Sequence, residues 1–351
     1  MSRPLFSAPA LALCLLLPAA PAAAEIMVDW SAVGQAAGTY TGKAPAGGDR
    51  WNGFAGYALT GRADGMTASG IGYGLVGTLG SGDYEKSLDR PGNREKATLN
   101  EVYVWLDTAY GQIRAGDEDG AAKRAVDLLP LLAGGQVDGF WTRAAAVAPP
   151  ADHLGRDSDD AAKVLYETPR LFGLRLGVSY APERKSLVED ITGLDAVPTE
   201  DDLWEVGLNW RTDSGPWSYE LAAGYVRGAA GAAGAADTES RKLAALVLYG
   251  GFAAGAVWFD EEVGDRTLGR VDRQGWTVQG TYENGPYGLA LWVSDIEAER
   301  LLEHTAYGLG LSWRARPELT LGLDLVRYDA DRPGASGRSG TVAQLSGEVR
   351  F

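Results

Sequence analysis

Apolar residues recur at every second position in stretch after stretch of this chain. In YGLALWV (287–293), Tyr, Leu, Leu and Val share one face, and ELTLGLDL (318–325) repeats the pattern with four leucines. A period of two is typical of β-strands that have one apolar and one polar face, whereas a helix repeats every 3.6 residues. The sequence therefore predicts an all-β protein, in which only 121–134 has a pattern that suits a short helix.

Aromatic residues stand at the ends of the apolar faces, and the opposite faces carry glycine, hydroxyl, amide and charged residues. The aromatic set is Trp204, Trp210, Trp276, Tyr282, Tyr287, Tyr307 and Trp313. Such bands are typical of strands that meet the two interfaces of a membrane, and the polar faces suit a water-filled interior. Since every backbone group in lipid must be paired, a sheet there has to close on itself. The pattern predicts a transmembrane β-barrel.

Short turns alternate with longer polar connections along the chain, as an up-and-down barrel requires. The predicted short turns include RADG (62–65), TAYG (108–111), GG (250–251) and ENGP (283–286), and the longer connections include 182–201, 261–272 and 296–304. The count that follows is sixteen antiparallel strands. An even number places both chain ends on the side of the short turns, which is the periplasmic side in bacterial barrels.

The first 24 residues have the pattern of a secretory signal peptide. Arg3 precedes an apolar run, and small residues precede Glu25. The domain division predicted is a signal peptide over 1–24 and a barrel over 25–351. Cys14, the single cysteine of the chain, lies in the signal segment, so the barrel is expected to contain no thiol.

The last strand, TVAQLSGEVRF (341–351), alternates up to Phe351. It is predicted to pair with the first strand and so to close the barrel. A terminal strand that ends in Phe resembles the signal by which the barrel-assembly machinery recognises outer-membrane barrels for insertion. Phe351 is therefore the candidate assembly signal, and that machinery is a predicted partner.

The charge balance excludes one class of partner. The chain has 47 acidic and 32 basic residues and a net charge of -15. Such an excess of negative charge argues against binding to nucleic acid, whose phosphates require basic surfaces.

Two segments carry a resemblance to a known family. LNEVYVWLDTAYGQIRAGDED (99–119) and AAKVLYETPRLFGLRLGVSYAP (161–182) resemble the strands on either side of the third external loop in general porins of Gram-negative bacteria, especially the alphaproteobacterial type. The resemblance implies a sixteen-stranded homotrimer in the outer membrane, in contact with lipid and lipopolysaccharide. It also implies diffusion of ions and small hydrophilic solutes through a water-filled channel, with no enzymatic activity.

The predicted third loop, about 118–161, is far longer than ordinary connections. Its apolar content predicts that it folds inward and narrows the pore; the alternative is an external loop that packs on the surface or contacts lipopolysaccharide. The resemblance implies that loop carboxylates face basic residues on the wall and that the field between them filters solutes. The acidic candidates at the constriction are Asp117, Glu118, Asp119, Asp127 and Asp138.

The basic half of such a filter is weaker in this sequence. By strand alternation Arg114, Arg175 and Glu101 point into the lumen, and Arg50 lies near its mouth. The same alternation points three further carboxylates inward: Glu205, Asp324 and Glu348. Because strands one to three lack an inward arginine cluster, we expect a mild preference for cations.

Three further hypotheses concern sites and function classes. Asp157, Asp159 and Asp160 are a candidate calcium site because carboxylate oxygens are the ligands that calcium prefers; no other cofactor is predicted. The two histidines, His153 and His304, are expected in solvated loops. The alternatives to a diffusion porin are a barrel with a substrate-specific channel, a barrel enzyme that uses His304 beside Glu303, and a secreted β-sandwich or lectin, which would not explain the aromatic bands.

Overall fold

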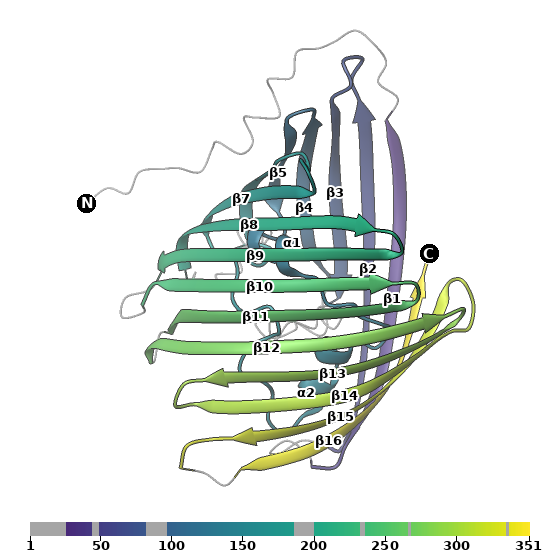
Figure 1. Cartoon of the computed structure of the whole chain (residues 1–351), viewed down its shortest axis with the longest axis vertical. Helices are drawn as coiled ribbons and strands as arrows, with labels where there is room; N and C mark the ends of the chain where they lie inside the picture. The colour runs from purple at the N-terminus through teal and green to yellow at the C-terminus, as the bar shows by residue number, and fades with distance from the viewer. Residues whose placement is uncertain are drawn as a thin grey trace.

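The computed structural model of the chain describes residues 26–43, 49–81, 97–185, 200–231, 236–265, 268–334 and 337–351. Within these residues sixteen strands form one closed antiparallel barrel, in which β1 pairs with both β2 and β16 (Figure 1). The strands are β1 (Met27–Thr41), β2 (Trp51–Met66), β3 (Gly72–Ser81), β4 (Ala97–Thr108), β5 (Gly111–Asp117), β6 (Ala162–Glu167), β7 (Leu174–Glu183), β8 (Glu200–Ser214), β9 (Trp217–Ala230), β10 (Thr238–Tyr249), β11 (Phe252–Asp265), β12 (Gly269–Asn284), β13 (Tyr287–Ala298), β14 (Leu302–Arg314), β15 (Leu319–Asp331) and β16 (Arg338–Arg350). The predicted closed barrel of sixteen antiparallel strands is confirmed.

Three short helices lie between β5 and β6: α1 (Ala121–Val126), the 3-10 helix η2 (Gln136–Asp138) and α2 (Trp141–Ala144). The helix predicted over 121–134 is therefore shorter than expected. It ends before Pro130, whose ring cannot continue a helix. Among the described residues no helix is long and apolar enough to cross a bilayer.

The end of the chain closes the barrel, as predicted. The N–H of Phe351 donates to the carbonyl of Ala32 at 2.9 Å, and the Phe351 carbonyl accepts from the Ala32 N–H at 3.0 Å. The Phe351 ring is 78 % exposed and so lies on the outer surface of the barrel. Recognition of this residue by the assembly machinery stays a prediction.

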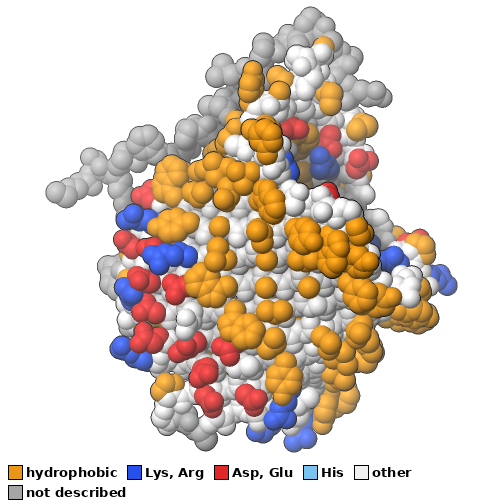
Figure 2. All heavy atoms as spheres, in the orientation of Figure 1, with side chains coloured by type: hydrophobic (Ala, Val, Ile, Leu, Met, Phe, Trp, Pro, Cys, Tyr) orange, Lys and Arg blue, Asp and Glu red, His pale blue; other side chains and the backbone are white. Residues whose placement is uncertain are grey.

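The two faces of the wall differ in chemistry, as the alternation predicts. In β13 exposed Tyr287, Leu289 and Leu291 alternate with buried Gly288 and Ala290. All seven aromatic residues of the predicted bands are exposed. Figure 2 shows apolar side chains covering the middle of the outer surface, and acidic and basic ones gathered along one edge. Burial of this apolar band in lipid is the main favourable term available to a barrel of this kind.

Several predicted connections are wrong because polar residues continue the strand ladder. RADG (62–65) belongs to β2, where Arg62 pairs across the ladder with Val76, and the turn lies further on, where the Thr67 N–H donates to the Ile71 carbonyl at 2.9 Å. The connections predicted at 261–272 and 296–304 contain strand residues over 261–265, 269–272, 296–298 and 302–304. The turns at 108–111, 250–251 and 283–286 lie where predicted.

Two predictions fall on residues that the structure does not describe. The signal peptide over 1–24 lies outside the described residues, and so does most of the connection predicted at 182–201. Both stay predictions.

Candidate functional site

The 44 residues between β5 and β6, here called the loop segment (118–161), contact the wall on the face opposite the exposed apolar band. Helix α1 packs against β7, β8, β9 and β10, and α2 contacts β1 and β16. In Figure 1 both helices are seen behind the front strands of the barrel. Val126, Leu128, Leu129 and Trp141 join the main cluster of buried apolar residues, so the apolar content of this segment is removed from water.

Glycines on the inner face of the wall allow the loop segment to approach the strands closely. A Cβ atom at Gly207 would lie 2.0 Å from the Ala121 carbonyl oxygen, and one at Gly322 would lie 2.5 Å from the Ala133 carbonyl oxygen. Similar close approaches of loop atoms occur at Gly177, Gly224, Gly255, Gly288 and Gly310. Because no other residue type leaves this space, the glycines define a track along the wall on which the loop segment lies.

Buried carboxylates of the wall accept hydrogen bonds from the backbone of the loop segment. Glu205, 1 % exposed, accepts from the N–H of Ala122 at 2.9 Å and from the N–H of Ser158 at 2.8 Å. One side chain therefore joins the start and the end of the loop segment to β8. Glu205 points to the inner face as predicted, but the loop segment covers it.

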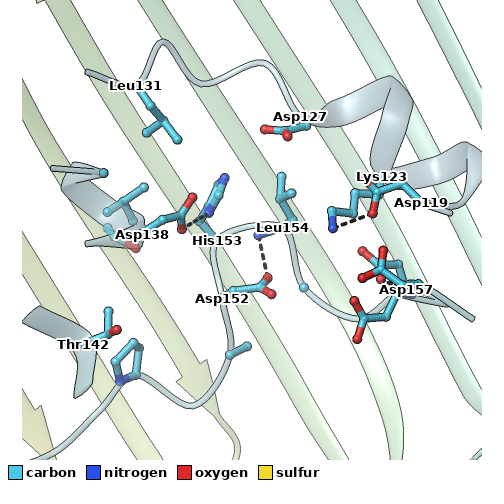
Figure 3. Close-up of a pocket in the computed structure, with 18 of the residues that line it drawn as sticks. Asp119, Lys123, Asp127, Leu131, Asp138, Thr142, Asp152, His153, Leu154 and Asp157 are labelled. Atoms are coloured by element: carbon cyan, nitrogen blue, oxygen red, sulfur yellow. Dashed lines mark hydrogen bonds and ion pairs between the residues drawn. The ribbon is translucent and has the colours of Figure 1, made fainter. Parts of the chain in front are cut away.

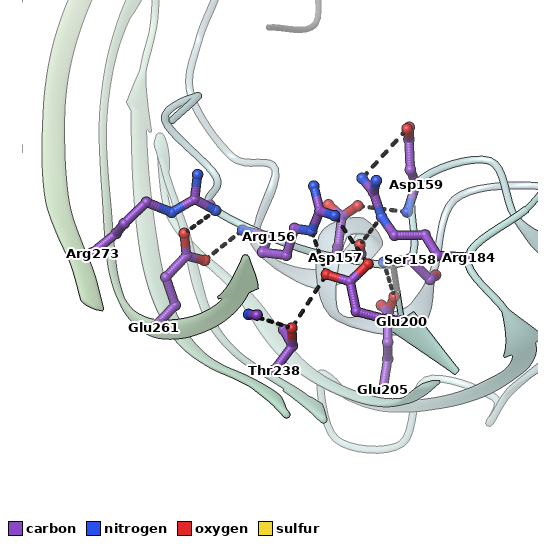
Figure 4. A network of polar contacts seen from close by, with 12 residues as sticks. Arg156, Asp157, Ser158, Asp159, Arg184, Glu200, Glu205, Thr238, Glu261 and Arg273 are labelled. Carbon is purple, nitrogen blue, oxygen red and sulfur yellow. Dashed lines mark hydrogen bonds and ion pairs between the residues drawn. The ribbon is translucent and has the colours of Figure 1, made fainter. Parts of the chain in front are cut away.

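A buried ionic network fixes the last turn of the loop segment (Figure 4). The Arg156 guanidinium donates to both carboxylate oxygens of Glu200, each at 2.9 Å. The backbone N–H of Arg156 donates to the Glu261 carboxylate at 2.5 Å. Arg273 reaches the same Glu261 at 2.7 Å, and the Lys242 ammonium donates to the Gly155 carbonyl at 3.2 Å. Bidentate geometry of this kind gives charge-assisted hydrogen bonds, which are stronger than neutral ones.

The middle of the loop segment is held by amides and aromatic rings. The side-chain amide of Gln136 donates to the Asp324 carboxylate at 3.1 Å, and the backbone N–H of Trp141 donates to the side-chain oxygen of Gln344 at 2.9 Å. The Trp141 ring packs against Trp292 and Tyr328, with centroid distances of 5.6 and 6.5 Å. Asp324, another wall carboxylate predicted to point inward, therefore also serves to hold the loop segment.

A cavity of about 620 Å³ is lined by the loop segment on one side and by β1 to β4 on another. Figure 3 shows the loop side of this cavity. The described lining has eight carboxylates against two lysine or arginine residues. The carboxylates are Glu101, Asp119, Asp127, Asp138, Asp152, Asp157, Asp159 and Asp160, and the cations are Lys123 and Arg184. The strands opposite the loop segment contribute Gln35, Thr60, Thr78, Asn100 and Glu101, and none of these is basic.

Some of the lining carboxylates are paired. Asp119 accepts from Lys123 at 2.7 Å, and Asp138 is paired with Nδ1 of His153 at 2.7 Å. Burial opposes a charged imidazole, but Asp138, followed by Asp127 and Asp152, outweighs it and raises the pKa of His153 to about 9. His153 is therefore cationic at neutral pH.

The predicted pore residues divide into two groups. Glu101, Asp119, Asp127 and Asp138 line the cavity, and so do the three aspartates of the calcium hypothesis. Asp117 and Glu118 are buried instead. Glu118 lies between the guanidinium groups of Arg114 and Arg124; burial raises the pKa of its carboxyl although both arginines oppose this.

The predicted basic residues do not line the cavity. Arg114 pairs with Glu118 and lies over the ring of Tyr103 at 5.4 Å. Arg175 lies on β7, and Arg50 is exposed in the connection between β1 and β2. No cation from these positions therefore opposes the loop carboxylates across the cavity.

The expectation that both histidines are solvated is wrong. His153 is in the loop segment but is 4 % exposed, and His304 lies within β14 at 2 % exposed, with Nε2 3.3 Å from the Val147 carbonyl oxygen. Glu303 is exposed on the other face of β14, so it does not form a pair with His304 at the rim. Strand alternation around 303–305 would have placed His304 inward had the stretch not been assigned to a connection.

The calcium hypothesis stays a prediction. Asp157 accepts from the Asp159 N–H at 2.7 Å and has the Lys242 ammonium at 3.9 Å, while Asp159 pairs with Arg184 at 3.5 Å. Burial would raise the pKa of Asp157, but Lys242 and Lys123 outweigh burial and lower it. In the part of the chain that the structure describes, no group of three or more carboxylate, histidine or cysteine side chains has an arrangement that could hold a metal ion.

Comparison with protein families identifies the relatives of this chain. The family model described as Gram-negative porin matches residues 10–347. The chain belongs to the Gram-negative porin family. This porin is therefore a protein of the bacterial outer membrane, and the family is one of non-enzymatic channels.

Solved structures with the same fold include three from named organisms. An anion-selective porin from Comamonas acidovorans is 18% identical, with a TM-score of 0.67 over 93% of this chain and 100% of that one. A variant of the Rh. blastica porin is 17% identical, with a TM-score of 0.61 over 93% and 100%. A loop-deletion variant of an outer membrane protein of Vibrio cholerae is 13% identical, with a TM-score of 0.62 over 93% and 99%. Comparison with curated protein sequences found no match.

Proposed function

We propose that this porin is a passive diffusion channel for ions and small hydrophilic solutes, that the loop segment forms its constriction, and that the constriction prefers cations mildly. One observation carries the proposal: the described lining of the cavity has eight carboxylates and two lysine or arginine residues. A narrow polar passage lined by one sign of charge raises the local concentration of the opposite ion.

The anchoring of the loop segment supports a permanent constriction. Its two ends are joined to β8 through Glu205, its last turn to β8 and β11 through Glu200 and Glu261, and its middle to β15 and β16 through Asp324 and Gln344. A segment held at so many buried points keeps its charges in fixed positions along the passage. Fixed charges filter ions better than charges on a mobile loop.

The anion selectivity of the Comamonas acidovorans porin does not transfer to this chain. At 18% identity the likeness concerns the fold, and selectivity depends on the side chains that line the passage. In this porin the wall strands opposite the loop segment supply threonine, glutamine, asparagine and glutamate to the cavity. The charge of the lining is therefore the better guide.

The test is the reversal potential of purified protein in planar bilayers under a potassium chloride gradient. We expect a potential of the sign that indicates cation preference, which decreases in high salt as the carboxylates are screened. A potential of the opposite sign would refute the charge argument. Absence of any conductance would refute the channel itself.

We also propose that the protein assembles as a homotrimer in contact with outer-membrane lipid and lipopolysaccharide, as the family resemblance implies. A band of exposed apolar side chains around the barrel supports contact with lipid or with neighbouring barrels. The mass of the detergent-solubilised particle tests the assembly, and a monomer mass would contradict it.

A further inference from the structure

The loop segment carries a carboxylate and a ring nitrogen that line the cavity and have no partner among the described residues. The carboxylate of Asp127, the C-cap residue of α1, is exposed and makes no hydrogen bond or ion pair with any described residue. His153 lines the same cavity at 4 % exposed, and its Nε2 has no hydrogen-bond partner among the described residues. A buried ring nitrogen without a partner is costly unless a ligand or water satisfies it.

The two groups have complementary chemistry. Nδ1 of His153 is engaged by Asp138 at 2.7 Å, so a protonated ring presents its second N–H as a donor directed elsewhere. Asp127 presents only acceptors. Figure 3 shows the His153 ring between Leu131 and Leu154, with its second nitrogen directed away from Asp138 and on the side where the Asp127 carboxylate lies. The negative charge of Asp127 is also among the causes that raise the pKa of His153.

We propose that Asp127 and His153 form a solute-binding site for small α-amino acids in their zwitterionic form. The ammonium group of the solute donates to Asp127, its carboxylate accepts from Nε2 of His153, and Leu131 and Leu154 contact its aliphatic part. A simple amine would satisfy Asp127 but leave its positive charge beside the imidazolium. A simple carboxylate would satisfy His153 but lie beside the unpaired charge of Asp127. The zwitterion avoids both penalties.

This inference rests on the proposed function, because the site is defined inside a conducting channel. The experiment measures block of the open-channel current at pH 7 by L-alanine, ethylamine, propionate and glycerol, each added in graded concentration. We expect L-alanine to reduce the current at lower concentration than the other three solutes. No conductance at all would refute the proposed function, whereas a conducting channel that L-alanine does not block would overturn this inference alone.

Substitutions locate the site. Loss of one charge-assisted hydrogen bond is expected to raise the half-blocking concentration of L-alanine about tenfold in Asp127→Asn and in His153→Leu. His153→Gln, which keeps an amide donor, is expected to lie between His153→Leu and the unmodified protein. The matched control is Glu299→Gln, an exposed position in the turn after β13, where block should change less than about twofold.

Other outcomes would overturn the zwitterion assignment. Equal block by ethylamine and L-alanine would mean a site for cations only, and equal block by glycerol would mean a site for hydroxyl groups. Block that is unchanged in Asp127→Asn would place the site elsewhere. Because Asp127 is exposed and carries no partner that its loss would strand, that variant is expected to fold even if a variant at buried His153 does not.

Discussion

Removal of the Arg156 guanidinium should detach the last turn of the loop segment from the wall. The Arg156→Met variant keeps an aliphatic side chain but leaves Glu200, which is fully buried, without its bidentate partner. A hydrogen bond that Glu200 accepts from the neutral Thr238 hydroxyl at 3.2 Å does not neutralise the carboxylate. Glu200 must then take up a proton or be hydrated by water, or the last turn of the loop segment must leave the wall.

The cost follows from burial. Loss of one partner of a buried ion pair costs about 3–5 kcal/mol, because the other charge stays desolvated. Since about 1.4 kcal/mol is a factor of ten, the ratio of docked to undocked loop should fall by about two to four orders of magnitude. An exposed pair costs only about 0.2–1 kcal/mol. Arg241→Met, which breaks the exposed pair of Arg241 with Glu239, is therefore the matched control on the same wall.

The assay is single-channel conductance with its fluctuations, combined with thermal unfolding followed by circular dichroism. We expect Arg156→Met to show a higher mean conductance and frequent transitions between levels, with Arg241→Met unchanged. The double variant Arg156→Met with Glu200→Met should recover much of the loss, because replacing both partners by apolar groups is often neutral. If Arg156→Met conducts and unfolds like the unmodified protein, the buried bridge does not hold the loop segment and the reasoning is wrong.

Two further predictions test the loop segment. The folded-state pKa of His153 is raised to about 9, so its pairing with Asp138 contributes fully to the stability of the folded protein below the ordinary pKa of about 6.5, and this contribution is lost as pH rises through 9. Cation preference should therefore increase between about pH 8 and 10, because the positive charge of His153 disappears. A His153→Gln channel should lack that step. Gly207→Ala places a Cβ 2.0 Å from the Ala121 carbonyl oxygen and should displace α1, which single-channel recording would detect as new conductance levels. The control is Gly38→Ala, whose Cβ would meet no atom within 4 Å and should leave the conductance levels unchanged. Identical traces for both variants would contradict the close approach at Gly207.

Alternation in the sequence was sufficient to predict the barrel because every strand that crosses the lipid presents apolar side chains on its outward face and polar ones on its inward face. It failed at the ends, where strands extend beyond the hydrocarbon and the outward face turns polar. The stretch 261–272 looks like a connection for this reason, yet Arg270 lies opposite Gly264 in the ladder and forms an ion pair with Glu262 at 2.6 Å. Polarity alone does not separate a solvated strand end from a loop, since both meet water.

The same ambiguity hid the residues that anchor the loop segment. Glu200 and Glu261 fall at the edges of predicted connections, where alternation does not orient a side chain, and Arg156 has no periodic neighbours to orient it. Its partner Glu200 is 44 residues away in the sequence, and the partner of Gln136 is 188 residues away. Such pairings depend on the closed barrel and are not encoded locally. A usable signal was the set of glycines on the polar faces of the strands, which mark where another segment lies against the wall.

The acidic residues of this porin have two separate roles: some hold the loop segment on the wall, and others line the cavity. Wall carboxylates such as Glu200, Glu205 and Asp324 are buried under the loop segment and hold it, and none of them lines the cavity. The negative lining comes mainly from the loop segment itself, with Asp127 as the exposed member that has no described partner. Position and selectivity should therefore respond to different substitutions, because the anchoring carboxylates are shielded from the passage and the Asp127 carboxylate makes no described contact that holds the loop segment. A change at Arg156 alters how wide the passage is, and a change at Asp127 alters which solutes pass.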